Sequence, residues 1–203
     1  MRIVSLVPSL TELLVDLGVK DDLVGRTRFC IHPKETVRTI PKIGGTKKVN
    51  IAKVQSLSPD LIIANKEENE QSQIEALSKK YPVWVSDITT QAEALEMIMD
   101  IGDLINRLDE AAQLTMKIVK HRMAYNNTRE KVENSQITVA YFIWQKPYMV
   151  AAKETFINDT ILNCGFINIF GSRNRYPEIS EIELKIANPH LILLAQQSLS
   201  TVK

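Results

Sequence analysis

One block of sequence occurs twice, and this repeat constrains the fold more than any other feature. Residues 57–64 and 187–195 each place a proline before an unbroken run of leucine, isoleucine and alanine. Each block follows a predicted helix, and each helix follows a glycine-containing loop, at Gly44-Gly45 in the first half and Gly171 in the second. An element order that recurs in this way predicts two similar structural units.

The first half alternates strand and helix patterns. Apolar runs at 2–6, 23–25, 60–64 and 83–86 predict strands, and helices are expected at 9–17, 50–57 and 68–80. Ser9 is expected to cap the first helix with Glu12 as its capping-box partner, and Gly18 is expected to end it. This alternation is typical of a parallel sheet covered by helices on both faces.

A helical stretch separates the two halves. Thr90 and Glu93 form a second predicted capping box, and helical spacing then continues with a break near residues 106–107. A helix over 108–131 would be about 36 Å long at 1.5 Å per residue, enough to brace two small domains. We therefore expect an α/β protein with an N-terminal lobe (1–89), a helical segment with a bridging helix (90–134) and a C-terminal lobe (135–203). Both lobes are predicted to be Rossmann-like with parallel sheets, with a ligand cleft at the carboxyl ends of their strands.

The second half of the repeat lacks its last elements. In the first half, the strand at 60–64 is followed by a helix and a further strand, whereas only residues 196–203 follow the matching strand at 191–195. Eight residues cannot form both a helix of about 11 residues and a strand of about 5. We therefore expect the second lobe to be incomplete within these residues, with an open sheet edge.

Composition excludes several classes of partner. The chain has 25 Lys and Arg against 24 Asp and Glu, so no overall field attracts nucleic acid. Its longest apolar runs are far shorter than the roughly 20 residues of a membrane span. The given residues show no export signal, which leaves a cytoplasmic location open.

Residues with catalytic or metal-binding chemistry are few. His32, His121 and His190 show no metal-ligand spacing, and only His32 is expected near the cleft. Cys30 and His32 lack an orienting acid, so a catalytic pair is not expected. We predict a protein that is not an enzyme and has no intrinsic cofactor.

Aromatic and cationic residues on the predicted cleft loops are more informative. Together they predict an aromatic, positively charged slot that suits a large flat ligand with carboxylates or phosphate. The set comprises Phe29, Lys47, Lys48, Trp144, Tyr148, Arg173, Arg175 and Tyr176.

Several motifs resemble the substrate-binding proteins of cobalamin- and siderophore-type ABC importers, and among these the cobalamin binders most closely. The opening residues 2–18 carry much of the resemblance, as does the Pro59-Asp60 strand. Further motifs lie at Val24-Gly25, His32-Pro33, Ile43-Gly44-Gly45, 165–170 and 176–180. The similarity covers essentially the whole chain.

The resemblance implies two lobes joined by one long helix, and it adds site residues. Family aromatics fall near Thr46 and Asn65, which join Phe29, His32, Lys47, Trp144, Tyr148, Arg175 and Tyr176 as the expected ligand-binding residues. His32 is the one candidate ligand for a metal in the cargo. Surface glutamates that dock onto the permease in such systems match Glu68 or Glu70 and Glu181 or Glu183.

The resemblance thus implies a monomeric, periplasmic or otherwise extracytoplasmic solute-binding protein. Its cargo would be cobalamin, haem or a ferric siderophore, and its partners an ABC permease with its ATPase. The alternative is a cytoplasmic enzyme or metallocofactor-handling protein on the same two-lobed scaffold, because a fold does not fix a function.

Overall fold

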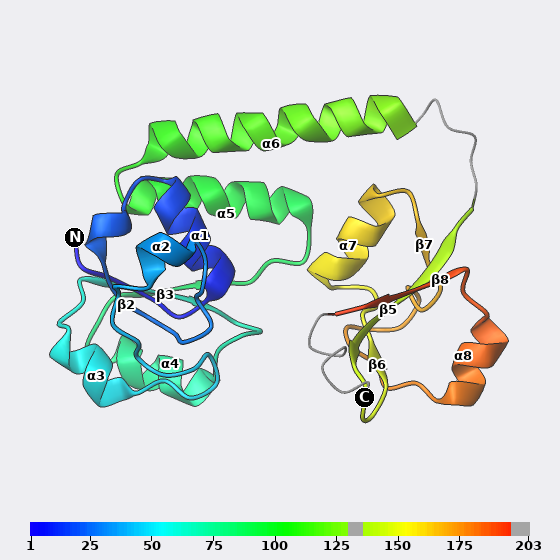
Figure 1. The fold of residues 1–203 in the computed structure, drawn as a ribbon, viewed down its shortest axis with the longest axis horizontal. Coiled ribbons are helices and arrows are strands. Elements are labelled where there is room, and N and C mark those ends of the chain that lie inside the picture. Colours follow the sequence, from blue (N-terminus) through cyan, green and yellow to red (C-terminus); the bar gives the residue numbers. More distant parts are fainter. Residues whose placement is uncertain (130–135, 196–203) are drawn as a thin grey trace. The chain divides into compact units, whose positions relative to one another are not determined.

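The computed structural model describes residues 1–129 and 136–195, whose contacts form two compact units (Figure 1). Unit 1 holds Met1–Asp87 and Met97–Met116, and unit 2 holds Ile88–Glu96 and Lys117–Lys203. The boundary runs through both helices of the 90–134 segment, and α6 (Leu108–Arg129) contributes residues to both units. The expected long helix is therefore present, and the positions expected at 130 and 131 lie outside the described residues.

Unit 1 is built on a four-stranded sheet whose neighbouring strands are all parallel. The strand order is β2-β1-β3-β4. In Figure 1, α3 and α4 lie on one side of these strands, and α1 and α5 lie on the other. The elements before α5 are β1 (Ile3–Ser5), α1 (Pro8–Asp16), a 3₁₀ turn (Lys20–Asp22), β2 (Leu23–Arg26), α2 (Lys34–Val37), α3 (Ile51–Ser56), β3 (Leu61–Asn65), α4 (Gln71–Ser78) and β4 (Val83–Ser86).

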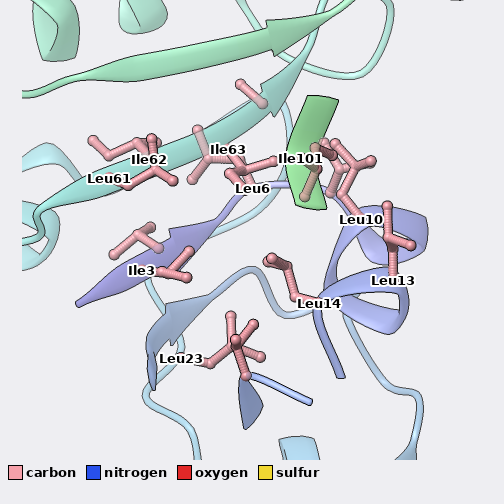
Figure 2. Close-up of a cluster of buried hydrophobic side chains, with 14 of the residues drawn as sticks. Ile3, Leu6, Leu10, Leu13, Leu14, Leu23, Leu61, Ile62, Ile63 and Ile101 are labelled. Carbon is pink, nitrogen blue, oxygen red and sulfur yellow. The ribbon is translucent and has the colours of Figure 1, made fainter. Parts of the chain in front are cut away.

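The core of unit 1 explains why its central strands are apolar throughout. Ile62 and Ile63 point to opposite faces of the sheet, yet both are fully buried. Leu14 of α1 and Ile101 of α5 (Gln91–Leu104) belong to the same buried cluster (Figure 2). A parallel sheet covered on both faces needs apolar side chains on both faces, as the sequence predicted.

The start of α1 differs from the expectation. Pro8 is the first helical residue and Val7 is the N-cap, so the predicted Ser9–Glu12 capping box is wrong. Proline suits this first position because its missing N–H would have no helical partner there. The other end is as expected, since Gly18 follows the helix with a positive φ of 81°.

The helical segment begins and breaks where the sequence indicated. The Glu93 N–H donates to Thr90 Oγ1 at 3.1 Å, and the Thr90 N–H donates to Glu93 Oε2 at 3.0 Å, which is the predicted capping box. Asn106, with a φ of 56°, separates α5 from α6. The chain reverses there because a left-handed residue cannot continue a helix.

Unit 2 has β5 at the centre of its sheet. β7 and β8 pair with β5 in parallel, and β6 pairs with it in the antiparallel direction. The expected all-parallel second sheet is therefore wrong at β6, because residues 145–148 form a tight turn that returns the chain along β5. The elements are β5 (Thr138–Trp144), β6 (Met149–Val150), α7 (Phe156–Asn163), β7 (Ile167–Asn168), α8 (Glu181–Ala187) and β8 (Leu191–Leu194).

The repeat predicted from the sequence is present in the structure. Asn50 caps α3 and Ser180 caps α8, each by accepting a backbone N–H with its side chain. Ser58 and Asn188 then adopt positive φ angles of 45° and 44° directly before the prolines. β3 and β8 each pair in parallel with the first strand of their own unit. Residues 50–64 and 180–194 thus have the same local structure.

Candidate functional site

Three loops at the carboxyl edge of the unit 1 sheet are tied into one surface. The Arg28 N–H donates to the Gly44 carbonyl at 2.8 Å, which joins the loop after β2 to the glycine loop. Lys47 Nζ donates to the Glu67 carbonyl at 2.6 Å, and Asn69 Nδ2 donates to the Thr46 carbonyl at 3.0 Å. These bonds hold the surface in place before any ligand arrives, which lowers the entropy cost of binding.

Phe29 forms an exposed aromatic platform on this surface. Its ring lies against Gly45, where an added Cβ would stand 3.2 Å from Phe29 Cε2. The Arg28 guanidinium lies 4.9 Å from the centre of the ring, and both side chains are exposed. The guanidinium therefore lies over the ring in a cation–π contact on an exposed surface.

Cys30 and His32 lie close together in the sequence, but one is buried and the other is exposed. Cys30 is fully buried, with its sulfur 3.1 Å from Thr27 Oγ1, whereas His32 is exposed. The thiol is therefore closed to substrate, while the imidazole remains accessible.

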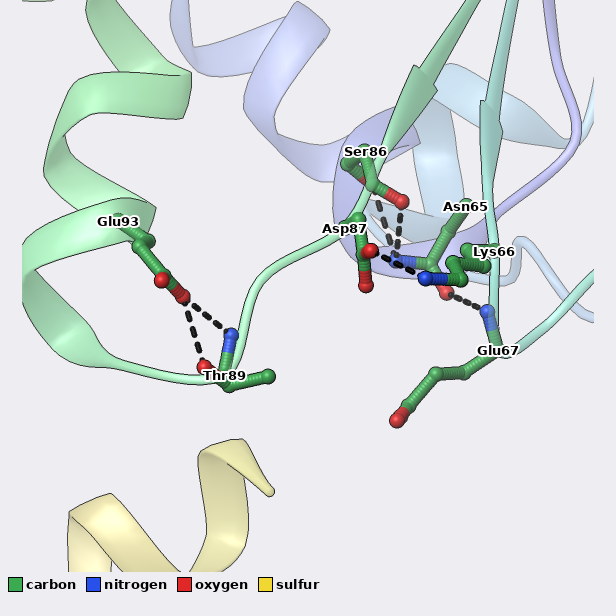
Figure 3. A network of polar contacts seen from close by, with 7 residues as sticks. All are labelled: Asn65, Lys66, Glu67, Ser86, Asp87, Thr89 and Glu93. Carbon is green, nitrogen blue, oxygen red and sulfur yellow. Dashed lines mark hydrogen bonds and ion pairs between the residues drawn. The ribbon is translucent and has the colours of Figure 1, made fainter. Parts of the chain in front are cut away.

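Thr46 and Asn65 serve mainly to shape the loops. Thr46 is buried, and Asn65 Nδ2 donates to Ser86 Oγ at 2.9 Å (Figure 3). Asn65 Oδ1 accepts the Glu67 N–H at 2.9 Å, so both ends of the amide are used within unit 1. Of the residues expected to bind ligand on this lobe, Phe29, His32 and Lys47 are exposed.

Two further polar contacts fix the chain after β4. Lys66 Nζ pairs with Asp87 at 2.5 Å across the ends of β3 and β4 (Figure 3). The Thr89 N–H donates to Glu93 Oε2 at 2.6 Å, and this bond is the main reason that the pKa of Glu93 lies below its ordinary value. A carboxylate that accepts backbone N–H groups favours its charged form.

In unit 2, Trp144 and Tyr148 lie together at an apolar groove of about 210 Å³. Tyr148 packs edge-to-face on Phe142, with ring centres 5.7 Å apart. Trp144 is half-exposed, and its Nε1–H donates to the Lys146 carbonyl at 3.0 Å. The groove is lined by Phe142, Trp144, Gln145, Tyr148, Leu184, Ile192 and Leu194.

Arg175 and Arg173 of unit 2 make different contacts. The Arg175 guanidinium lies 5.9 Å from the centre of the Tyr176 ring, a second arginine–aromatic pair on a loop. Arg173 instead forms an ion pair with Glu183 and lies 5.6 Å from the Phe170 ring. Arg173, which the sequence placed among the ligand-facing cations, thus has an internal partner.

The four candidate docking glutamates also differ. Glu68, Glu70 and Glu181 are exposed. The Glu183 carboxylate accepts bonds from Arg173 and from the Ser180 backbone and hydroxyl. Chiefly through Arg173, and then through Ser180, these bonds lower the pKa of Glu183 to about 2. Glu183 therefore has a structural task in unit 2.

Sequence reasoning missed the partnership of Arg28 and Gly45 with Phe29. The signal was present as an arginine next to an aromatic residue, with a glycine pair downstream, but only the folded loops bring them together. Among the described residues, no group of three or more His, Cys, Asp or Glu could hold a metal ion. The described helices also include none that is long and apolar enough to cross a bilayer.

Comparison with known proteins finds similar proteins that are named for vitamin B12 or haem binding. The vitamin B12-binding protein of Yersinia pestis is 25% identical over 197 residues, which are 96% of this chain and 69% of the relative. Two solved structures share the fold over 98% of this chain and 78% of their own. They are the periplasmic vitamin B12-binding protein of Vibrio cholerae (23% identity, TM-score 0.82) and the periplasmic haem-binding protein of a Roseiflexus species (20%, 0.86).

The family comparison agrees with the fold and with the motifs of the opening strand. The profile of the periplasmic binding proteins matches residues 3–203, which is nearly the whole chain. Two α/β units and a long helix shared between them are what the sequence predicted for such a protein. The chain belongs to the periplasmic binding protein family.

Proposed function

We propose that this protein captures a corrinoid, haem or ferric-siderophore-like ligand and delivers it to an ABC permease with its ATPase. The observation that carries the proposal is an arginine beside an aromatic ring on a loop of each unit. These pairs are Arg28 with Phe29 and Arg175 with Tyr176. Relatives named for vitamin B12 and haem binding share the fold and support this ligand class.

The chemistry of the pairs suits a large planar ligand with acidic substituents. An aromatic face stacks on a macrocycle, and a neighbouring guanidinium pairs with a carboxylate at its rim. His32, exposed on the loop that carries Phe29, is the proposed imidazole ligand for a metal within the cargo. Binding of this kind needs no covalent step.

The Cys30 thiol does not support the alternative proposal of an enzyme on the same scaffold. Cys30 is buried against Thr27, so the thiol–imidazole pair raised by the sequence has no exposed nucleophile. Family membership favours capture and an extracytoplasmic location. The exposed glutamates Glu68, Glu70 and Glu181 are the proposed contacts with the permease.

The aromatic anchors provide the test of this site. Phe29→Ala and Trp144→Ala should each weaken ligand binding by about 1–3 kcal/mol, the usual loss for an aromatic anchor. Haemin and cyanocobalamin are titrated against both variants by absorbance. Met123→Ala, at an exposed apolar residue of α6, is the control and should bind as the unmodified protein does. Unchanged affinity in both aromatic variants would contradict the proposed site.

A further inference from the structure

The long helix α6 carries charges of opposite sign at different places along its length. It is one continuous helix of 22 residues (Figure 1). Asp109 and Glu110 lie in its first turn, and both are exposed. No acidic residue follows them within the helix, whereas Lys117, Lys120 and Arg122 are exposed cations. The helix is therefore negative at its start and positive beyond its middle.

Five exposed residues form one stripe on this helix. They follow each other at spacings of four, three, four and three residues, which place them along a single line. Ala111, in contrast, is fully buried beside Gly102 of α5, so α6 packs on its own chain through another face. Met116 and Met123 are 63% and 61% exposed. The α6 stripe comprises Asp109, Gln113, Met116, Lys120 and Met123.

The charges of the α6 stripe are only partly explained within one chain. The helix dipole favours an acidic residue in the first turn, but this effect is confined to the terminal turns and does not reach Lys120. Among residues 1–129 and 136–195, neither Lys117 nor Lys120 forms an ion pair. Glu110 lies 3.7 Å from Arg107, and an exposed pair of this kind contributes little. The two lysines are therefore free to meet acidic groups outside the chain.

The order of the charges makes the α6 stripe complementary to itself when it is reversed. In an antiparallel pair of α6 helices, Gln113 of each copy can lie opposite Met116 of the other. Asp109 then lies opposite Lys120 of the second copy, and Glu110 lies near Lys117 of the second copy. Twofold symmetry repeats each of these contacts. A parallel pair would instead place like charges opposite each other, which is unfavourable.

We propose that the α6 stripe binds the α6 stripe of a second copy of this chain in the antiparallel direction, which gives a symmetric dimer. Alternating spacings of three and four residues are those of helices that pack side by side. One helix from each copy forms an interface smaller than the roughly 1,200 Å² of stable complexes, so the dimer should be weak and reversible. This proposal goes beyond the monomer that the family resemblance implies, and it does not depend on the identity of the ligand.

A lipid surface is a less suitable occupant than a second copy. Anionic headgroups would attract Lys117 and Lys120. They would also repel Asp109, which lies on the same stripe, and Glu110 beside it. A second copy satisfies the charges of both signs at once.

Sedimentation equilibrium from about 1 to about 300 μM protein, in about 50 mM salt, tests the proposal. The unmodified chain should form dimers with a Kd below about 100 μM. This Kd should rise at least about tenfold in about 500 mM salt, because salt screens exposed charges. Lys120→Glu places two carboxylates opposite each other and should raise the Kd at least about tenfold. Adding Asp109→Lys to Lys120→Glu should restore the dimer, because the two charges then attract again in exchanged positions.

Lys185→Glu is the matched control, since it makes the same charge change at an exposed position of α8. It should form dimers as the unmodified chain does, and circular dichroism verifies that every variant is folded. A monomer throughout the concentration range would overturn the proposal, as would a dimer that Lys120→Glu leaves intact. A folded double variant that stays monomeric would also overturn it. Binding of the unmodified chain to phosphatidylglycerol vesicles without dimerisation would assign the cations to a lipid surface and contradict the proposed dimer.

Discussion

Four arginines of this protein differ in the contacts that their side chains make. Arg28 and Arg175 each lie beside an aromatic ring on a loop. Arg173 is held by Glu183, and the buried Arg26 donates from Nε to the Val37 carbonyl at 2.6 Å. Arg173 and Arg26 thus help to organise their own units, whereas Arg28 and Arg175 each make a contact with an aromatic ring.

The pKa of Glu183 predicts a defined acid dependence of stability. Its pKa of about 2 lies below the ordinary value of 4.5 that applies when the chain is unfolded. The carboxylate therefore stabilises the fold fully above about pH 4.5, and this contribution is lost as the pH falls toward 2.

The variant Glu183→Gln should thus unfold at a lower temperature than the unmodified protein at pH 7, with the difference shrinking between pH 4.5 and 2. Thermal unfolding followed by circular dichroism across this range checks it. Glu181→Gln removes a charge from the same helix but leaves the Arg173 pair, and should show a smaller difference at pH 7. A pH-independent difference for Glu183→Gln would refute this role.

The exposed glutamates are predicted to act on transport and not on ligand capture. Glu70→Lys and Glu181→Lys should each lower the ligand-stimulated ATPase rate of the permease complex by about tenfold, the effect of a reversed charge at a complementary interface. Ligand affinity should stay unchanged. Arginine at an exposed position of α6, as in Lys120→Arg, serves as the charge-neutral control. A normal ATPase rate in both glutamate variants would remove them from the docking surface.

Among the elements, the conformation of the glycine loop before α3 requires a glycine at position 44. Gly44 has a φ of 118°, and a Cβ there would lie 2.4 Å from the Lys48 carbonyl oxygen. Gly18 has a φ of 81° but has nothing within 4 Å of such an atom. A side chain at Gly18 would thus cause backbone strain alone, whereas one at Gly44 would cause both strain and steric overlap.

Gly18→Ala should therefore cost about 1–2 kcal/mol of unfolding free energy, the price of a left-handed alanine. Gly44→Ala should cost more, because the overlap with backbone adds to the strain. Urea unfolding of the two variants measures the difference. An equal loss in both would show that the loop relaxes around the new side chain.

Elements could be predicted where local chemistry decides them. The Thr90–Glu93 capping box and the long helix α6 follow from neighbouring residues alone. The Ser9 cap failed because Pro8 took the first helical position. The two-residue strand β6 has too little sequence to show a pattern and forms only through its pairing with β5.

The exposed positions of two aromatic residues could be predicted from the sequence, whereas the residues that contact them could not. Phe29 and Trp144 lie on exposed loop or strand-end positions, as expected. The contact of Phe29 with Gly45, and the pairing of Arg173 with Glu183, join residues that no local pattern links. Such contacts depend on the packing of whole loops.

At the scale of the molecule, the repeat accounts for the architecture of both units. Two parallel pairings of the same kind, β1 with β3 and β5 with β8, are built from matching sequence blocks. Each unit then adds its own arginine–aromatic pair. We expect the proposed ligand to be large and partly apolar, because it would stack on exposed aromatic rings.

Titration of the unmodified protein with cyanocobalamin, haemin and a ferric siderophore, followed by tryptophan fluorescence, tests the proposed capture of a large ligand. Saturable binding of at least one of them, at one ligand per chain and with a Kd below about 10 μM, is the predicted result. Maltose is the control and should give no change. The absence of saturable binding by all three ligands at about 100 μM, in a chain that circular dichroism shows to be folded, would contradict the proposed ligand capture.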